Sequence, residues 1–178
     1  MEAIVIHKKQ WIIKTLLVIV LGFISVYSFA QTDPTDSIPG DPGALSVYTV
    51  QNMSFGAFSI GSTGGTVIIS NNGSRSVTGD VVLLNLGTLY FQSIFDIDAP
   101  LGSIVSILNG SDATLTGSNG GSMSMQIGNS NPSSPFITIV SQPSRTQVSI
   151  GGKLIVGSPA ANPPGTYTGT FYITFNQE

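Results

Sequence analysis

The sequence predicts an all-β protein, an antiparallel β-sandwich of immunoglobulin-like or pilin-like type with about ten short strands. Only 8% of the residues are charged, against roughly 25% in ordinary soluble domains, and Gly, Ser, Thr and Asn supply the polarity. After residue 43, short runs of alternating apolar and polar residues are separated by Asn-Gly and Gly-Gly pairs. Such runs are typical of strands joined by tight turns.

The first thirty residues predict a secretory signal peptide. Three lysines precede an apolar run that ends in Ser-Phe-Ala, which favours cleavage between Ala30 and Gln31. The alternative is a retained membrane anchor, but the apolar run over residues 16–30 is shorter than the roughly 20 residues of a spanning helix. We therefore expect export by the general secretory route of a Gram-negative cell. The product would reach the periplasm, the outer surface or the medium, and would touch the membrane only through the signal before cleavage.

Two further segments follow the signal. Residues 31–43 contain three prolines and one large apolar residue, Ile38, and are predicted to be a flexible leader. Because this leader has no alternating apolar residues, we do not expect it to act as a strand donated to another molecule. Residues 44–178 are predicted to form the β-sandwich domain.

The composition after cleavage argues against enzyme chemistry. The chain has no Cys, and its only His, His7, lies in the signal. The remaining chain would lack the commonest general base, the commonest metal ligand and the thiol nucleophile. Three of six basic residues and one of nine acids would be lost, giving a net charge of 3 − 8 = −5. We expect no enzyme activity, no cofactor and no nucleic-acid partner, since the chain has no basic footprint.

Strands are expected throughout the domain, in chain order. The predicted segments are residues 44–50, 53–60, 64–70, 80–86, 88–97, 103–108, 112–117, 122–127, 136–140, 146–150, 152–157 and 166–175. The pair Asn72-Gly73 predicts a hairpin turn in which both residues have positive φ. The apolar positions expected in the core are Val67, Ile69, Phe91, Ile94, Phe95, Ile137 and Ile139.

The last predicted strand has two distinct faces. Tyr167, Phe171, Ile173 and Phe175 fall on alternate positions, with Thr and Tyr between them. We expect this strand to pair inside its own domain. The alternative is that it lies at an edge and pairs with a strand of the same protein or of another surface subunit.

One pair of acids is a candidate metal site. Asp96 and Asp98 share one face of a predicted strand, and two carboxylates can contribute oxygen ligands to Ca²⁺. The loop pattern of a calcium motif is absent. Paired carboxylates also serve glycosidases, where one lies on each side of the sugar bond. Two neighbouring acids on one face of a strand do not by themselves make that arrangement. We therefore expect no metal site and no catalytic residues.

Four motifs resemble a known family. They are MSFG at residues 53–56, GGTVII at 64–69, GGKLIV at 151–156 and PPGTYTGTF at 163–171. The chain resembles the domain of unknown function 4402 family of exported bacterial proteins, over about residues 45–176. The resemblance implies a β-sandwich outside the inner membrane and brings no established catalytic residues. The ending is also similar to that of fimbrial subunits of the spore-coat-U type, which assemble by strand exchange.

Two functional hypotheses follow. The first is an exported, non-enzymatic structural or adhesive component of the cell surface, similar to a fimbrial protein. The second is a soluble periplasmic or secreted module that binds a glycan or another small ligand. Self-association of the purified protein would favour the first, and binding to a glycan array would favour the second.

Overall fold

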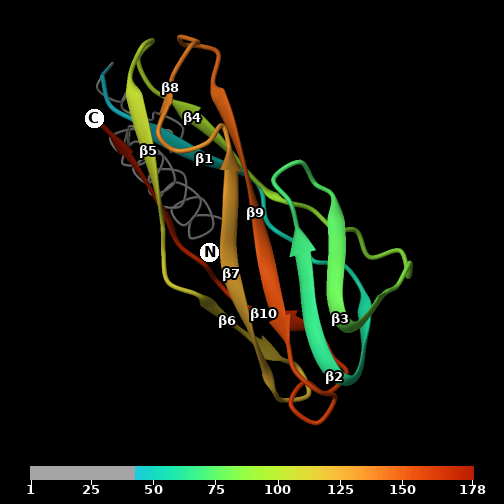
Figure 1. Ribbon diagram of the computed structural model, residues 1–178. Helices are drawn as coiled ribbons and strands as arrows, with labels where there is room; N and C mark the ends of the chain where they lie inside the picture. Colours follow the sequence, from blue (N-terminus) through green and yellow to red (C-terminus); the bar gives the residue numbers. More distant parts are fainter. Residues whose placement is uncertain (1–42) are drawn as a thin grey trace, which may run out of the picture. The chain divides into compact units, whose positions relative to one another are not determined.

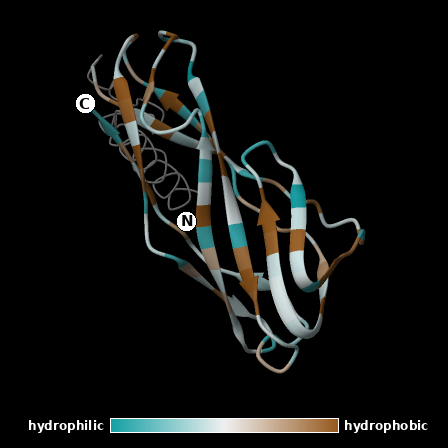
Figure 2. Ribbon diagram, viewed as in Figure 1, coloured by the Kyte–Doolittle hydropathy of each residue, from teal (hydrophilic) through white to brown (hydrophobic). Residues whose placement is uncertain are grey.

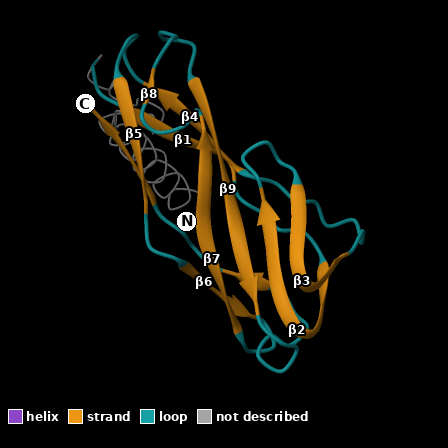
Figure 3. Ribbon diagram, viewed as in Figure 1, coloured by secondary structure: helices purple, strands orange, loops and turns teal. Residues whose placement is uncertain are grey.

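The computed structural model describes residues 43–178, which contain strands and loops only (Figure 3). The predicted signal, its cleavage site at Ala30 and Gln31, and the predicted leader up to residue 42 lie outside the described residues. No helix long and apolar enough to cross a membrane is present in the part of the chain that the structure describes. The expectation of an all-β protein with about ten strands is confirmed.

The described residues contain eleven strands, and every pairing between these strands is antiparallel. They are β1 (Ser46–Gln51), β2 (Phe58–Ile69), β3 (Arg75–Leu83), β4 (Ser93–Asp98), β5 (Ile104–Asn109), β6 (Ala113–Gly117), β7 (Ser122–Asn131), β8 (Phe136–Ile137), β9 (Thr146–Val156), β10 (Tyr167–Thr168) and β11 (Ile173–Gln177).

The large sheet is organised around β9. Its strand order is β1-β4-β9-β7-β6-β10, and β2 pairs with both β9 and β3. The first half of β9 pairs with β4 and the second half with β2, while the opposite edge pairs with β7 along most of its length. Figure 1 shows β9 running between β7 on one side and β2 on the other. Both edges of β9 are therefore paired.

A small sheet with the order β11-β5-β8 covers one half of the large sheet. Between them lies the closed core, whose buried residues are Ile97, Ala99, Val105, Phe136, Val148 and Ile150. Phe95 and Phe175 add to it, with ring centroids 5.5 Å apart. Two sheets packed over a shared apolar layer make this half a sandwich.

The second half of the large sheet carries its own core, which we call the open core. Its buried residues are Phe55, Val67, Ile69, Val81, Ala113, Met123, Met125, Leu154 and Val156. No strand of the small sheet contributes a residue to this cluster in the described chain. Its cover comes instead from the segment around Phe55 and from the C-terminal segment, through Tyr167 and Phe171.

The C-terminal segment pairs inside its own domain. Its first part, β10, pairs with β6, and its last part, β11, pairs with β5. Tyr167 and Phe171 pack against the open core, whereas Ile173 and Phe175 pack against the closed core. The alternation of the last strand thus places all four of these side chains inward, and one segment ties the two halves together.

Three predicted core assignments are wrong. Ile137 and Ile139 are 59% and 80% exposed, while their neighbours Phe136 and Thr138 are buried. Phe136 stands opposite the buried Val105, so the alternation along β8 is shifted by one residue from the predicted one. Phe91 is also exposed, because it lies in a bridge with Ser54 before β4 begins.

Other predictions differ in detail. Only residues 58–60 of the predicted strand at 53–60 form a strand, and they are continuous with the one predicted at 64–70 in β2. The predicted strands at 146–150 and 152–157 merge into β9. The predicted turn exists, but only Gly73 has positive φ, at 82°. Asn72 instead accepts a hydrogen bond on its side-chain oxygen from the Ser74 amide. This contact stabilises the turn without a left-handed Asn.

Truncation of Phe175 tests the role of the last strand. Phe175→Ala should lower the free energy of unfolding because it removes a ring from the closed core. Since Phe175 is only partly buried, we expect a loss of about 2–3 kcal/mol. Thr174→Ala, on the exposed face of the same strand, is the matched control and should change it by less than about 0.5 kcal/mol. Equal effects in urea denaturation would contradict the pairing described.

Candidate functional site: an apolar groove and an apolar face

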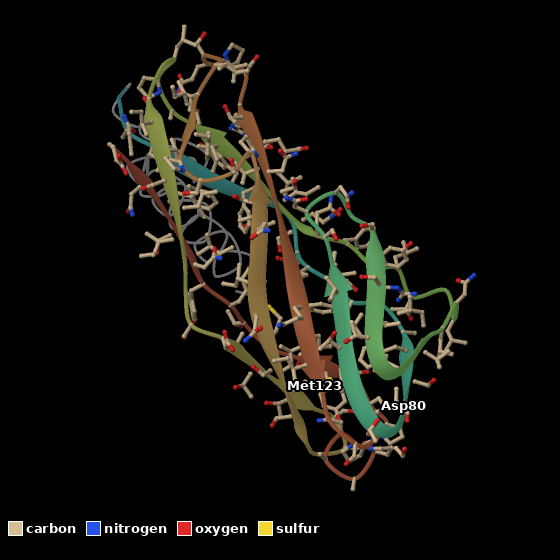
Figure 4. The ribbon with its side chains drawn as sticks, viewed as in Figure 1. Asp80 and Met123 are labelled. Atoms are coloured by element: carbon tan, nitrogen blue, oxygen red, sulfur yellow. The ribbon has the colours of Figure 1, made fainter. Side chains whose placement is uncertain are left out.

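An apolar groove of about 530 Å³ opens onto the open core. Its floor comes from β6, β7 and β9, through Leu115, Met123, Met125 and Leu154. Figure 4 labels Met123 on β7, and Asp80 on β3 opposite the irregular stretch of β2. The volume lies within the roughly 300–1,000 Å³ typical of ligand pockets.

The lining of the groove carries no formal charge. Its residues are Met53, Ser54, Phe55, Gly56, Ala57, Phe58, Ile60, Leu84, Leu86, Thr88, Leu115, Met123, Met125, Leu154, Pro163, Pro164, Gly165, Thr166, Tyr167, Thr168, Gly169 and Phe171. None of them is Asp, Glu, Lys or Arg. A surface of this kind favours apolar contact and backbone hydrogen bonding over acid–base chemistry.

Arg75 holds the first wall of the groove, which is formed by residues 53–58. Its guanidinium donates to the carbonyls of Phe55 at 3.0 Å and Ala57 at 3.3 Å, and to Leu84 at 3.4 Å. The same group lies 4.3 Å from the centre of the Tyr90 ring. One side chain thus connects this wall to the loop after β3, and the wall is fixed before any ligand arrives.

The second wall, residues 163–171, is held by the turn between β6 and β7. The Tyr167 hydroxyl donates to the Pro163 carbonyl at 2.8 Å, and the Asn119 amide donates to the Pro164 carbonyl at 2.7 Å. Below the wall, the buried Asn162 accepts from the Gly157 amide and donates to the Ser122 carbonyl. These contacts make the second wall rigid as well.

Part of the second wall is a strand edge facing the groove. The carbonyls of Thr166 and Tyr172 accept from Ser118 and Gly110, on the side of β6 and β5. Peptide groups alternate in direction along a strand, so that of Tyr167 in β10 faces away from β6, while Gly169 and Phe171 follow in the stretch between β10 and β11. None of these three residues takes part in the backbone hydrogen bonds found outside the ladders of the described strands. Donors and acceptors therefore remain available at this edge.

A second apolar surface, which we call the outer face, lies on the small sheet. Because Val105 and Phe136 point into the closed core, their neighbours Ile104 and Ile137 point outward, opposite one another. The exposed large side chains of this face are Leu101, Ile104, Leu108, Ile137, Ile139 and Tyr172. Figure 2 shows the hydrophobic stretches of β5. Several large apolar side chains exposed on one side of a sheet indicate an interaction site.

A polar depression of about 400 Å³ lies elsewhere on the large sheet. Its lining includes Gln126, Asn129, Gly151 and Lys153. The register shift in β7 between Ile127 and Ser130 opens it. Polar side chains around a glycine-lined floor suit a polar ligand better than an apolar one.

The sequence-predicted site residues lie in different places. Tyr167 and Phe171 line the groove, whereas Ile173 and Phe175 lie in the closed core. Asp96 and Asp98 lie together on the face of β4 opposite its core residues, and Asp98 accepts a hydrogen bond from Gln142 at 3.1 Å. Among the residues described, no group of three or more His, Cys, Asp or Glu side chains could hold a metal ion.

Sequence reasoning missed the groove itself. Its walls are separated by about a hundred residues of chain, so no local pattern predicts that they meet. The final strand gives no signal either, because Gly169, the small residue between Tyr167 and Phe171, lies against the backbone of β6 at Thr114 and Leu115 and opens no space.

Substitution of Arg75 tests how the first wall is held. Arg75→Ala should lower the free energy of unfolding by about 2 kcal/mol, because three carbonyls lose a charged donor. The control is Arg145→Ala, because Arg145 also lies over a tyrosine ring, that of Tyr48, but is exposed. It should cost no more than about 1 kcal/mol. Equal losses in chemical denaturation would show that the carbonyl contacts contribute nothing.

Comparisons with known proteins cover the whole β-sandwich domain. A search of curated proteins and a search of solved structures each found no significant match. A family model described as "Domain of unknown function (DUF4402)" matches residues 45–176, which span all eleven strands but for the last residue of β11. The chain therefore belongs to the DUF4402 family, as its motifs predicted.

Proposed function

We propose that this protein is an exported, non-enzymatic structural or adhesive component of the cell surface, which acts by contact with other protein molecules. The outer face of the small sheet is the observation that carries the proposal. It presents six large apolar side chains, of which Ile139 is 80% and Tyr172 is 76% exposed. Side chains of this kind gain free energy when a second surface removes them from water.

The outer face suits a second copy of the same chain. Residues 101–109, 136–140 and 172–177 contain no charged side chain. Two copies meeting through this face would bury few charges, although the chain after cleavage carries a net charge of −5 by the count given above. Flat sheets with apolar outer faces can associate by stacking.

The groove supports the same class of function. Its lining holds no acid, base or cationic side chain, and its walls are fixed by internal hydrogen bonds. A preformed apolar groove with an available strand edge is suited to binding a protein segment. The fimbria-like ending of the sequence agrees with assembly as the role.

Self-association through the outer face is the expected behaviour of the purified protein. Light scattering after size exclusion should give a mass that rises with concentration. The double variant Leu108→Asp/Ile137→Asp should weaken association by at least roughly tenfold, because it places carboxylates in the apolar contact. Leu86→Asp, which is equally exposed but lies at the groove, should leave association unchanged within about twofold.

A wild-type protein that stays monomeric at every concentration would contradict the self-association proposal. So would association that the Leu108→Asp/Ile137→Asp variant leaves intact. Circular dichroism of each variant checks that the β-sheet signal persists, so that loss of association is not loss of folding.

The polar depression favours a second candidate function, a soluble module that binds a glycan or another small polar ligand. Lys153 and Gln126 would supply its polar contacts. Clear hits on a glycan array that Lys153→Ala removes would support this function. An array without hits, together with concentration-dependent association, would favour the structural one.

A further inference from the structure

We propose that the groove accepts an extended, uncharged strand supplied by a different protein, which completes the cover of the open core. This inference rests on the proposed function, since it names a partner for such a surface protein. The closed core is covered by a complete small sheet, whereas the open core is covered by two separate segments with the groove between them. One more strand would fill that gap.

The backbone of the second wall specifies an extended ligand. Tyr167, Gly169 and Phe171 line the groove, and none of them takes part in a backbone hydrogen bond outside the ladders of the described strands. A strand laid along them would form a ladder of backbone hydrogen bonds, which a lipid chain cannot do. The geometry therefore favours a peptide over a fatty acid of the same apolar character.

The floor specifies which side chains the strand carries. Tyr167 and Phe171 pack against the open core, and Gly169 between them lies against the backbone of β6 at Thr114 and Leu115. Met123 and Leu154 lie at the bottom of the groove. Aliphatic side chains at alternate positions of the incoming strand would reach this floor, and a charged one would be buried without a partner.

A second copy of this chain has no suitable segment to give. Each described strand is already paired within its own domain. Residues 31–42, which precede the described part, contain three Asp, three Pro and a single large apolar residue, Ile38. Proline cannot donate to a ladder, and Asp would be buried against an uncharged lining. A chain that accepts a strand and donates neither a described strand nor residues 31–42 would end an assembly rather than extend it.

A synthetic peptide tests the proposal directly. The probe is a seven-residue peptide of alternating Val and Thr, blocked at both ends and fluorescently labelled, and the measurement is anisotropy with the protein purified after export. We expect saturable binding. The variant Leu86→Asp/Thr88→Asp, at the exposed rim of the groove, should weaken binding by at least roughly tenfold. The matched control Leu108→Asp/Thr174→Asp, an exposed pair on the outer face, should change it by less than about twofold.

Two further probes make the outcome decisive. The same peptide N-methylated at alternate residues cannot form the ladder and should not bind, and a block-ordered peptide of equal composition should bind at least roughly tenfold more weakly. If these peptides bind as tightly as the original probe, or if a fatty acid alone displaces the probe, the ligand does not bind as a paired strand. If the groove variant loses self-association and the outer-face variant keeps it, the strand comes from a second copy of this chain and not from a different protein. The peptide-binding results do not depend on association through the outer face, so their failure leaves the proposed function separately testable.

Discussion

The whole structure depends on the pairing of β9 along both edges. Its even-numbered residues Val148, Ile150, Leu154 and Val156 all point to one face and are at most 3% exposed. The first two belong to the closed core and the last two to the open core. At Gly152, between them, a side chain would collide with the sulfur of Met53. One continuous strand thus serves two apolar clusters, and neither can form without it.

The two halves on this strand differ in how they are covered. The small sheet closes one half with three strands that pair with one another. The other half is covered by two segments that are each fixed from behind, one by Arg75 and one by the turn between β6 and β7. Because both segments are held away from one another, the space between them stays open. We infer that this difference in cover underlies function: the half with the closed core stabilises the fold, and the half with the open core offers a surface to a partner.

Much of the fold could be predicted from the sequence, because alternation is a local property. The final strand illustrates this, since its period of two residues correctly predicts which side chains point inward. The short β8 shows the limit: only two residues pair, and in the run Phe-Ile-Thr-Ile-Val four of five residues are apolar, so it fits either parity. The groove could not be predicted, because its walls meet only in the folded chain. The wrong parity at Ile137 and Ile139 also concealed the outer face.

Hydrogen exchange of the purified protein without any added peptide tests the open edge most directly. Gly169 and Phe171 line the groove and their amides make no backbone hydrogen bond, whereas the amides of β9 lie inside a ladder paired on both sides. The account predicts fast exchange at Gly169 and Phe171 and slow exchange along β9. Protection at Gly169 and Phe171 as strong as that of β9 would mean that the edge is already paired and that the open half is in fact closed.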